Sequence, residues 1–250
     1  MSNKRLFFPL ALILVFFIIL PFVGIFSGID GSILKDTLED RLVIKSIFLT
    51  LRASLWATLT ALLFGIPLSY LLARKSFHFK KVVEGLIDIP VIIPHTAAGI
   101  ALLSVWGRNS VISKVFGLNI MGSEAAVSIA MFFVSVPFLI NSVKTGFRMV
   151  DPKYEKTAIS LGASPWQSFY SVSLPMVKKS IISGSIMMWG RGISEFGAVV
   201  ILAYHPMTAP IMIYERFTNF GLKYAVPITV IMVIISLFIF IILKFFEERE

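Results

Sequence analysis

Residues 6–26 read LFFPLALILVFFIILPFVGIF, an apolar run without a single charged side chain. A helix of this length, at about 1.5 Å per residue, crosses the hydrocarbon core of a bilayer, which is about 30 Å thick. The run is also longer than the apolar core of a cleaved signal peptide, and no small-x-small cleavage site clearly follows it. It therefore predicts a retained transmembrane helix.

The rest of the chain has the same character. Of its 250 residues, 57% are hydrophobic and 15% are charged, against about 25% charged residues in an average soluble domain. Five further segments have the length and apolarity of a span: residues 47–73, 82–106, 125–143, 177–203 and 224–246. None alternates apolar and polar residues, so helices are expected rather than the strands of a barrel. These features predict an all-α, polytopic protein of the cell membrane with six transmembrane helices.

The basic residues predict how the chain is oriented. Its formal net charge is +9, but lysine and arginine flank the apolar runs instead of forming one face of a soluble body. A nucleic-acid partner is therefore not expected. The basic residues gather at both ends of the chain, at residues 74–81 after the second span, and at residues 144–156 after the fourth. By the positive-inside rule, both termini are predicted to be cytoplasmic.

Prolines interrupt the third span at Pro90 and Pro94. A proline removes a backbone donor and kinks a helix, and membrane helices tolerate this where neighbouring protein or a cavity satisfies the freed groups. The kink serves either helix packing or a bend that lines a pathway, and both interpretations stay open.

Two opposite charges, Arg191 and Glu195, lie near the middle of the fifth predicted span. A charge at that depth costs about 2.5–3.5 kcal/mol on insertion scales, which makes both residues functional candidates. They are four positions apart and can pair on one helix face. A structural ion pair is the favoured interpretation, and a direct role of Arg191 on an anion's path is the alternative. Because small residues such as Ser194 allow close helix packing, we expect this span to line the pathway and contribute to a gate.

The segment 151–175 is the most informative soluble loop. Asp151 can cap a helix that begins with a proline, and Gly162 can supply the positive φ that commonly ends one. Ser164 and Gln167 have the spacing of a capping box. The loop should therefore form two short helices around a glycine turn. Apolar and aromatic side chains share their faces: Tyr154, Ala158 and Leu161 on the first, and Trp166, Phe169 and Tyr170 on the second. Such residues either dock a partner or fold back onto the membrane ends of the spans.

Several chemistries find no support in the sequence. The chain has no cysteine, which excludes disulfides and thiolate sites. Its three histidines, His78, His95 and His205, have no metal-ligand spacing, and we expect structural or interfacial roles for them. No G-x-x-x-x-G-K-[ST] loop and no serine, histidine and carboxylate constellation is present. The chain is thus predicted not to be an enzyme and to bind no metal or cofactor of its own.

A family resemblance becomes specific at residues 155–162, which read EKTAISLG and are followed by Leu174 and Pro175. This pattern resembles the "EAA" loop of ATP-binding-cassette (ABC) importer permeases, although Lys156 and Thr157 stand where the family pattern has Glu and Ala. Three more segments resemble the molybdate/tungstate permeases and their sulfate relatives, most of all the archaeal molybdate/tungstate transport permeases: residues 88–99, 189–198 and 203–216.

This resemblance implies a type I ABC importer fold that imports an oxyanion by alternating access. It implies a homodimer of this chain in the lipid bilayer, two ATPase subunits that bind ATP and Mg, and an external oxyanion-binding protein. Residues 1–44 would form the first helix and an external loop, residues 45–246 the five-helix transmembrane domain, and residues 247–250 a cytoplasmic tail. The loop would seat in the ATPase through residues drawn from its two helices: Tyr154, Glu155, Lys156, Ala158, Leu161, Gly162, Trp166, Leu174 and Pro175.

The choice between molybdate and tungstate stays open, because both oxyanions have the same charge and tetrahedral shape. An ion-coupled secondary transporter or channel is the first alternative, since kinked spans alone do not specify an energy source. It would need membrane-buried carboxylates, of which Glu195 is the clearest. A membrane-embedded enzyme is the second alternative, and it would need a cluster of acid/base or metal-binding residues.

Overall fold

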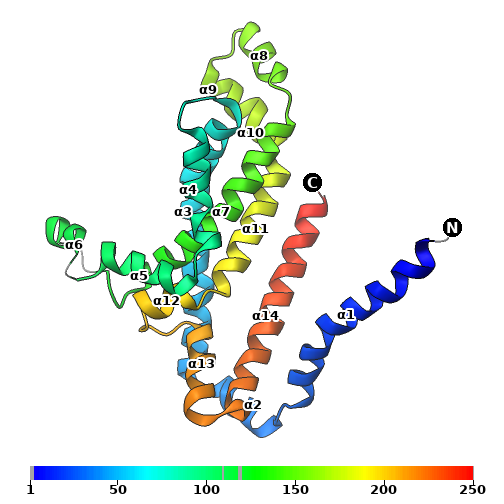
Figure 1. The fold of residues 1–250 in the computed structure, drawn as a ribbon, viewed down its shortest axis with the longest axis vertical. Helices are drawn as coiled ribbons and strands as arrows, with labels where there is room; N and C mark the ends of the chain where they lie inside the picture. Colours follow the sequence, from blue (N-terminus) through cyan, green and yellow to red (C-terminus); the bar gives the residue numbers. More distant parts are fainter. Residues whose placement is uncertain (1–2, 109, 118–119, 250) are drawn as a thin grey trace.

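The computed structural model describes residues 3–108, 110–117 and 120–249, and its elements are helices (Figure 1). Within these ranges there is no β-strand, which confirms the all-helical prediction. In chain order the helices are α1 (Asn3–Ser27), α2 (Gly31–Glu39), α3 (Arg41–Arg74), α4 (Lys80–Ile92), α5 (His95–Trp106), α6 (Val111–Phe116), α7 (Glu124–Met149), α8 (Lys153–Ser160), α9 (Pro165–Ser168), the π-helix η1 (Phe169–Ser173), α10 (Leu174–Met176), α11 (Lys178–Ile193), α12 (Gly197–Leu202), α13 (Ala209–Phe220) and α14 (Leu222–Arg249). Helix α14 runs into the predicted tail, of which residue 250 lies outside the described ranges.

Among the described residues, four helices are long and apolar enough to cross a membrane, namely α1, α3, α7 and α14. A fifth crossing follows only if α4 and α5 count as one broken span, because they meet at a bend of 115°. The interruption expected from the prolines of the third span is thus a full break between two helices rather than a kink within one. Pro94 lacks the N–H that a helix needs, and Ile93 before it is extended (φ −74°, ψ 150°), as expected for a residue that precedes proline.

The predicted fifth span is also not one helix. Helix α11 ends at Ile193, and the chain turns through three residues before α12 begins at Gly197. The three glycines at 190, 192 and 197 weaken the helix here. The Glu195 side chain also accepts a hydrogen bond from the N–H of Ala198 at 2.8 Å, which starts the new helix instead of continuing the old one.

The core lies where α3, α7 and α11 pack together (Figure 1). Small residues let these helices approach closely. A Cβ atom on Gly184 of α11 would lie 2.9 Å from the Cβ of Ser142 on α7, and one on Gly192 would lie 3.2 Å from the Cβ of Ser54 on α3. The close packing expected from the small residues of this segment is thus confirmed.

Polar contacts fix the end of the molecule where α2 meets α3. Asp40 caps α3 by accepting from the N–H of Leu42 at 2.8 Å, and Arg216 of α13 pairs with the same carboxylate at 2.6 Å. Asp30 caps α2, and hydrogen bonds from Ser32 and Lys223 hold its pKa down at about 2. These contacts join the start of α3 to the last two helices.

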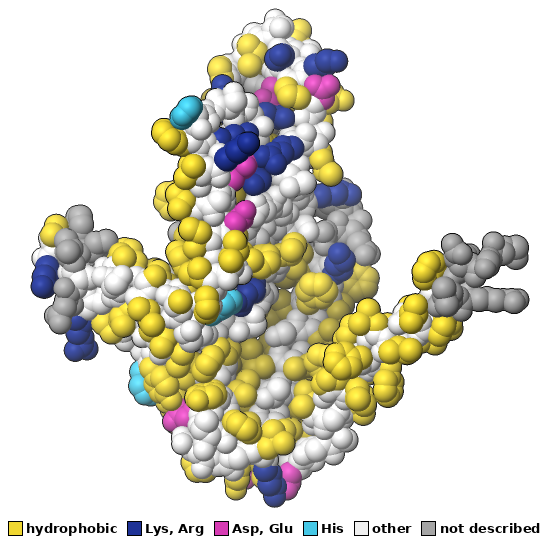
Figure 2. All heavy atoms as spheres, viewed as in Figure 1, with side chains coloured by type: hydrophobic (Ala, Val, Ile, Leu, Met, Phe, Trp, Pro, Cys, Tyr) yellow, Lys and Arg dark blue, Asp and Glu magenta, His cyan; other side chains and the backbone are white. Residues whose placement is uncertain are grey.

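Helix α1 stands apart from the other helices (Figure 1), and its spanning window is not buried against them. An apolar cavity of about 970 Å³ is bounded by α1, α11, α13 and α14. Figure 2 shows apolar side chains along α1 and across the middle of the molecule, with several basic side chains near the end that carries α8. This distribution is that of a multi-pass membrane protein.

Candidate functional site

Two helix breaks, distant in the sequence, meet inside the molecule. One lies between α4 and α5, and the other between α11 and α12. A Cβ atom on Gly197 would lie 2.7 Å from the Cβ of His95, and one on Gly99 would lie 2.8 Å from the Cβ of Ile201. Because neither glycine has a side chain, α5 and α12 pack almost backbone to backbone, and this contact brings His95 beside Glu195.

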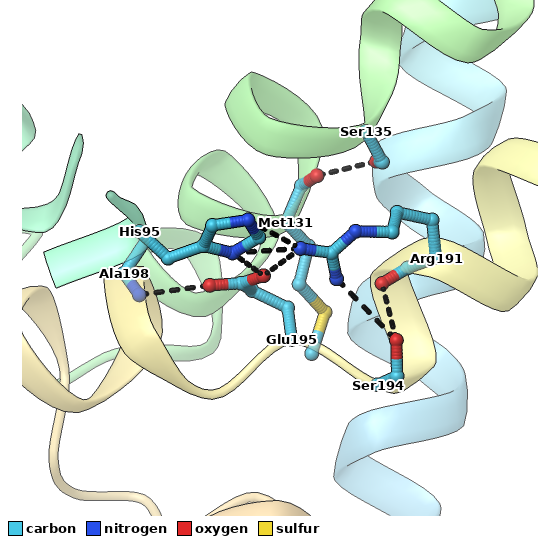
Figure 3. A network of polar contacts seen from close by, with 7 residues as sticks. All are labelled: His95, Met131, Ser135, Arg191, Ser194, Glu195 and Ala198. Atoms are coloured by element: carbon cyan, nitrogen blue, oxygen red, sulfur yellow. Dashed lines mark hydrogen bonds and ion pairs between the residues drawn. The ribbon is translucent and has the colours of Figure 1, made fainter. Parts of the chain in front are cut away.

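A charged triad of His95, Arg191 and Glu195 occupies this meeting point (Figure 3). His95 Nδ1 lies 2.7 Å from Glu195 Oε2, and Arg191 Nη2 lies 2.9 Å from the same oxygen. Arg191 Nη2 also lies 2.6 Å from His95 Nδ1 and 2.9 Å from His95 Nε2. The guanidinium reaches Ser194 as well, through Nη1 to Oγ at 3.3 Å.

Burial differs sharply within this triad. The Glu195 side chain is 1% exposed, whereas that of Arg191 is 24% exposed. Arg191 lies in the last turn of α11, where a helix dipole favours a cation. A buried carboxylate costs free energy unless it is paired and hydrogen-bonded, and here Glu195 has two side-chain partners and the N–H of Ala198. The carboxylate is therefore the buried, fixed member, whereas the side chains of His95 (34% exposed) and Arg191 are both partly open to solvent.

A second cavity, of about 780 Å³, lies between α4, α7 and α11. It is lined by Asp88, Val91, Ile92, Pro137, Phe138, Asn141, Ser142, Thr145, Met149, Lys179, Ser180, Ser183 and Met187. Asn141 donates to Asp88 across it at 2.7 Å. Met187 lines the cavity and lies about one helical turn before Arg191 on α11, and Ile92 lines it three residues before His95, on the other side of the break. The triad is thus about one turn beyond the lining of a partly polar cavity.

The loop at residues 151–175 forms the second candidate site. The Asp151 carboxylate accepts from the N–H of Lys153 at 2.9 Å, and Gly162 has φ +98°. Ser164 and Gln167 form the reciprocal capping box, with bonds of 3.2 and 2.7 Å. The predicted pair of short helices around a glycine turn is therefore confirmed. The second of them continues through η1 into α10.

Large side chains of this loop face outward. Leu161 is 84% exposed and Trp166 is 67% exposed, with Tyr154 and Tyr170 about half exposed. Lys156, Gly162 and Pro175 are exposed, while Ala158 and Leu174 are partly buried. Phe169 instead points inward, where its ring centroid lies 4.9 Å from that of Tyr70. The loop thus has an aromatic root in the helix bundle and an apolar outer surface.

Glu155 belongs to the root of the loop and not to its outer surface. Arg74 Nε at the end of α3 donates to Glu155 Oε1 at 2.8 Å, and the Tyr70 hydroxyl donates to Oε2 at 2.9 Å. Arg74 also donates to the carbonyl of Val150 at 2.9 Å. With 12% of its side chain exposed, Glu155 connects the loop to α3. This position differs from the outward contact with an ATPase implied by the resemblance.

The structure therefore sorts the expected residues into groups. Arg191, Ser194 and Glu195 lie together, and Pro94 forms the neighbouring break, whereas Pro90 is buried one turn earlier in α4. His95 is the residue that the sequence did not single out. Its position directly after Pro94 was the available signal, because a polar residue at a helix break is well placed to face another chain segment.

These features, multiple apolar helices with paired breaks and a loop with an exposed apolar surface, define a multi-pass membrane protein. Residues 65–250 match the family described as binding-protein-dependent transport system inner membrane component. The molybdate/tungstate transport system permease protein of Thermococcus kodakarensis is 45% identical over 247 residues, which is 98% of this chain and 96% of that protein. The protein of the same description from Methanocaldococcus jannaschii is 43% identical, over 96% of this chain and 95% of that one.

A solved structure shares the fold. It is a bacterial ABC transporter involved in the import of the acidic polysaccharide alginate, and the match has a TM-score of 0.79 at 15% identity. It covers 99% of this chain and 96% of the other. Taken with the sequence relatives, this chain belongs to the ABC importer permeases, in the molybdate/tungstate branch that is related to the sulfate permeases.

Proposed function

We propose that this chain is the membrane-spanning subunit of an ATP-driven importer that translocates molybdate or tungstate by alternating access. The observation that carries the proposal is the 43–45% identity, over nearly the whole chain, to permeases described as molybdate/tungstate transporters. The chain itself is not catalytic in this proposal. ATP and Mg are bound by separate ATPase subunits.

The assembly in this proposal is a homodimer of the chain with two ATPase subunits inside and an oxyanion-binding protein outside. Each chain crosses the membrane six times with cytoplasmic termini, and residues 45–246 form the transmembrane domain. The bent pair of α4 and α5 and the pair of α11 and α12 then supply the third and fifth crossings as broken helices. Broken helices at this depth suit a transport path, because irregular backbone is tolerated where it is buried in protein or lines a cavity.

In this proposal, the loop from α8 to α10 passes the conformational change of the ATPase subunits to the membrane helices. Leu161, Trp166 and Tyr154 supply the outer contact surface, and their exposure supports docking. The Arg74–Glu155 pair then carries movement of the loop into α3. Each ligand must favour one conformation for such coupling to work, so closure of the ATPase dimer would select one arrangement of the loops.

Arg191, Ser194 and Glu195, with Pro90 and the break at Pro94, line or gate the path in this proposal. The support is their place about one turn beyond a partly polar cavity. A neutralised arginine also suits conduction, since a site that holds an anion too strongly would not release it.

Reconstitution tests the proposal. The chain is incorporated into liposomes with its ATPase subunits, and uptake of radiolabelled tungstate is measured with the loaded binding protein outside. Uptake that requires both ATP and the binding protein is expected. Uptake by the chain alone, driven by an ion gradient, would refute the ABC mechanism in favour of a secondary transporter.

A further inference from the structure

His95 and Arg191 both place nitrogen atoms against one oxygen of Glu195, Oε2. A carboxylate accepts hydrogen bonds and donates none, so the 2.7 Å contact between His95 Nδ1 and Glu195 Oε2 needs a proton on that nitrogen. Arg191 is always protonated and has only donors. Its Nη2 lies within 2.9 Å of both ring nitrogens of His95 and of the same Glu195 oxygen. Nη2 and the protonated Nδ1 are thus two donors only 2.6 Å apart, and although a carboxylate oxygen can accept from both, they compete for the same space beside it.

The charge of His95 decides how this competition ends. With a neutral imidazole the three side chains sum to zero, and the guanidinium can rest against the uncharged ring. With an imidazolium, two cations face each other within 2.9 Å over a single carboxylate. Like charges at that distance repel each other. One of the two cations must then move.

The surroundings indicate which cation moves. The Cβ of His95 lies against Gly197, where not even a methyl group would fit, and Glu195 is held by the N–H of Ala198. Arg191 has a long flexible side chain, and its Nη1 already reaches the exposed Ser194. The arginine is therefore the group that can turn away.

The other charged groups of the packed helices are engaged elsewhere. Helices α5 and α12 carry no titratable side chain besides His95. On α4, Asp88 accepts from Asn141, and Glu84 pairs with Lys144 and Arg148 of α7. At the far end of α7, Glu124 pairs with Arg52 of α3. Arg191 and Glu195 are thus the charged partners that the described residues provide for His95.

We propose that His95 is a positioning residue for Arg191. Protonated His95 takes over Glu195 and releases the Arg191 guanidinium toward the path, where it binds a tetrahedral dianion. Neutral His95 returns the arginine to Glu195 and lets the anion leave. The inference rests on the proposed function, in that the α11–α12 break must border the anion's path. By linkage, a proton on His95 and the anion in the path favour the same state.

His95→Asn tests the proposal, because asparagine can keep an N–H near the position of Nδ1 but does not titrate. His78→Asn is the matched control, since His78 is exposed in the α3–α4 connection and has no contact with the triad. The assay is tungstate uptake per ATP hydrolysed by the complete reconstituted importer. Wild type and His78→Asn should both lose about fivefold or more when the assay pH is raised from about 6 to about 8. His95→Asn should stay level.

A wild-type pH profile in His95→Asn, or a level profile in wild type, would overturn the inference. If His95→Asn does not assemble, the wild-type complex without the binding protein gives a second test. Tungstate should raise its thermal unfolding midpoint more at about pH 6 than at about pH 8, and an equal rise overturns the proposal. No ATP-dependent uptake in any variant refutes the proposed function instead. Uptake with identical profiles in all variants refutes only the role of His95.

Discussion

The described part of the chain contains two well-shielded arginine–glutamate pairs that differ in how the carboxylate is shared. At the loop, Arg74 binds one oxygen of Glu155 and Tyr70 binds the other, so the two side chains do not share an acceptor. At the helix breaks, Arg191 and His95 crowd onto one oxygen of Glu195. The first arrangement allows one set of contacts and suits a rigid connection. In the second, either His95 or Arg191 can be the main partner of the carboxylate, which suits a part that changes conformation.

The largest effect is expected when the charge of each carboxylate is removed in turn. Glu195→Gln leaves the Arg191 cation without its buried counter-charge, and we expect a loss of about 3–5 kcal/mol in the free energy of unfolding. Glu155→Gln keeps acceptor and shape at a less buried position, with an expected loss of about 2–3 kcal/mol. Denaturation of the detergent-solubilised protein measures both. Equal losses would remove the distinction between the two pairs.

The two regions should also differ in what they bind. Trp166→Ala truncates an exposed aromatic residue of the loop, and we expect it to weaken ATPase-subunit binding by about 2–4 kcal/mol, as for an interface hot spot. The unfolding free energy should stay within about 0.5 kcal/mol of wild type. Phe79→Ala, at an equally exposed aromatic in the α3–α4 connection, serves as the control. Affinity measured by surface-immobilised ATPase should not change for it, and equal weakening by both variants would contradict the docking role.

One added methyl group should disrupt the close contact that brings the two helix breaks together. Gly197→Ala places a Cβ atom 2.7 Å from the Cβ of His95, and such overpacking costs about 1–3 kcal/mol. Gly190→Ala is matched, because it lies on α11 with no atom within 4 Å of the added Cβ. It should be neutral or stabilising by up to about 1 kcal/mol. The thermal unfolding midpoints of the two variants should therefore shift in opposite directions or differ clearly.

The smallest effect is expected at the turn of the loop. Gly162 has φ +98°, and Gly162→Ala should cost about 1 kcal/mol through backbone strain while leaving the triad intact. Gly85→Ala on α4, which meets no neighbouring atom, provides the comparison. Tungstate uptake per ATP should fall for Gly162→Ala only. A loss of stability as large as that of Gly197→Ala would mean that the loop is more tightly integrated than its exposed surface indicates.

Sequence reasoning succeeded where local chemistry determines the structure. The capping box of Ser164 and Gln167 and the turn at Gly162 depend on residues a few positions apart, and the structure has both. The fifth span was predicted without a break, and the third only with a proline kink, because hydropathy measures apolarity and not continuity. Pro94 marked one break, but the 115° bend also depends on how closely Gly99 packs against α12.

The triad was only half visible in the sequence for the same reason. Arg191 and Glu195 are four residues apart, so helix periodicity suggested their pairing. His95 lies 100 positions from Glu195 and reaches it only after both breaks have formed. The inward direction of Glu155 likewise depends on Tyr70 and Arg74, which lie more than 80 positions earlier. The features that the sequence did not reveal depend on long-range packing rather than on residue type.

Helix α3 gives these contacts a mechanical meaning. It runs through 34 residues, or about 51 Å, and an ion pair holds each end: Asp40 with Arg216 at one, and Arg74 with Glu155 at the other. A rod of that length that pivots at one end by about 1° displaces the other by about 1 Å, by simple leverage over the helical rise. Movements at the loop smaller than a bond length would then suffice to make or break hydrogen bonds near the opposite membrane surface.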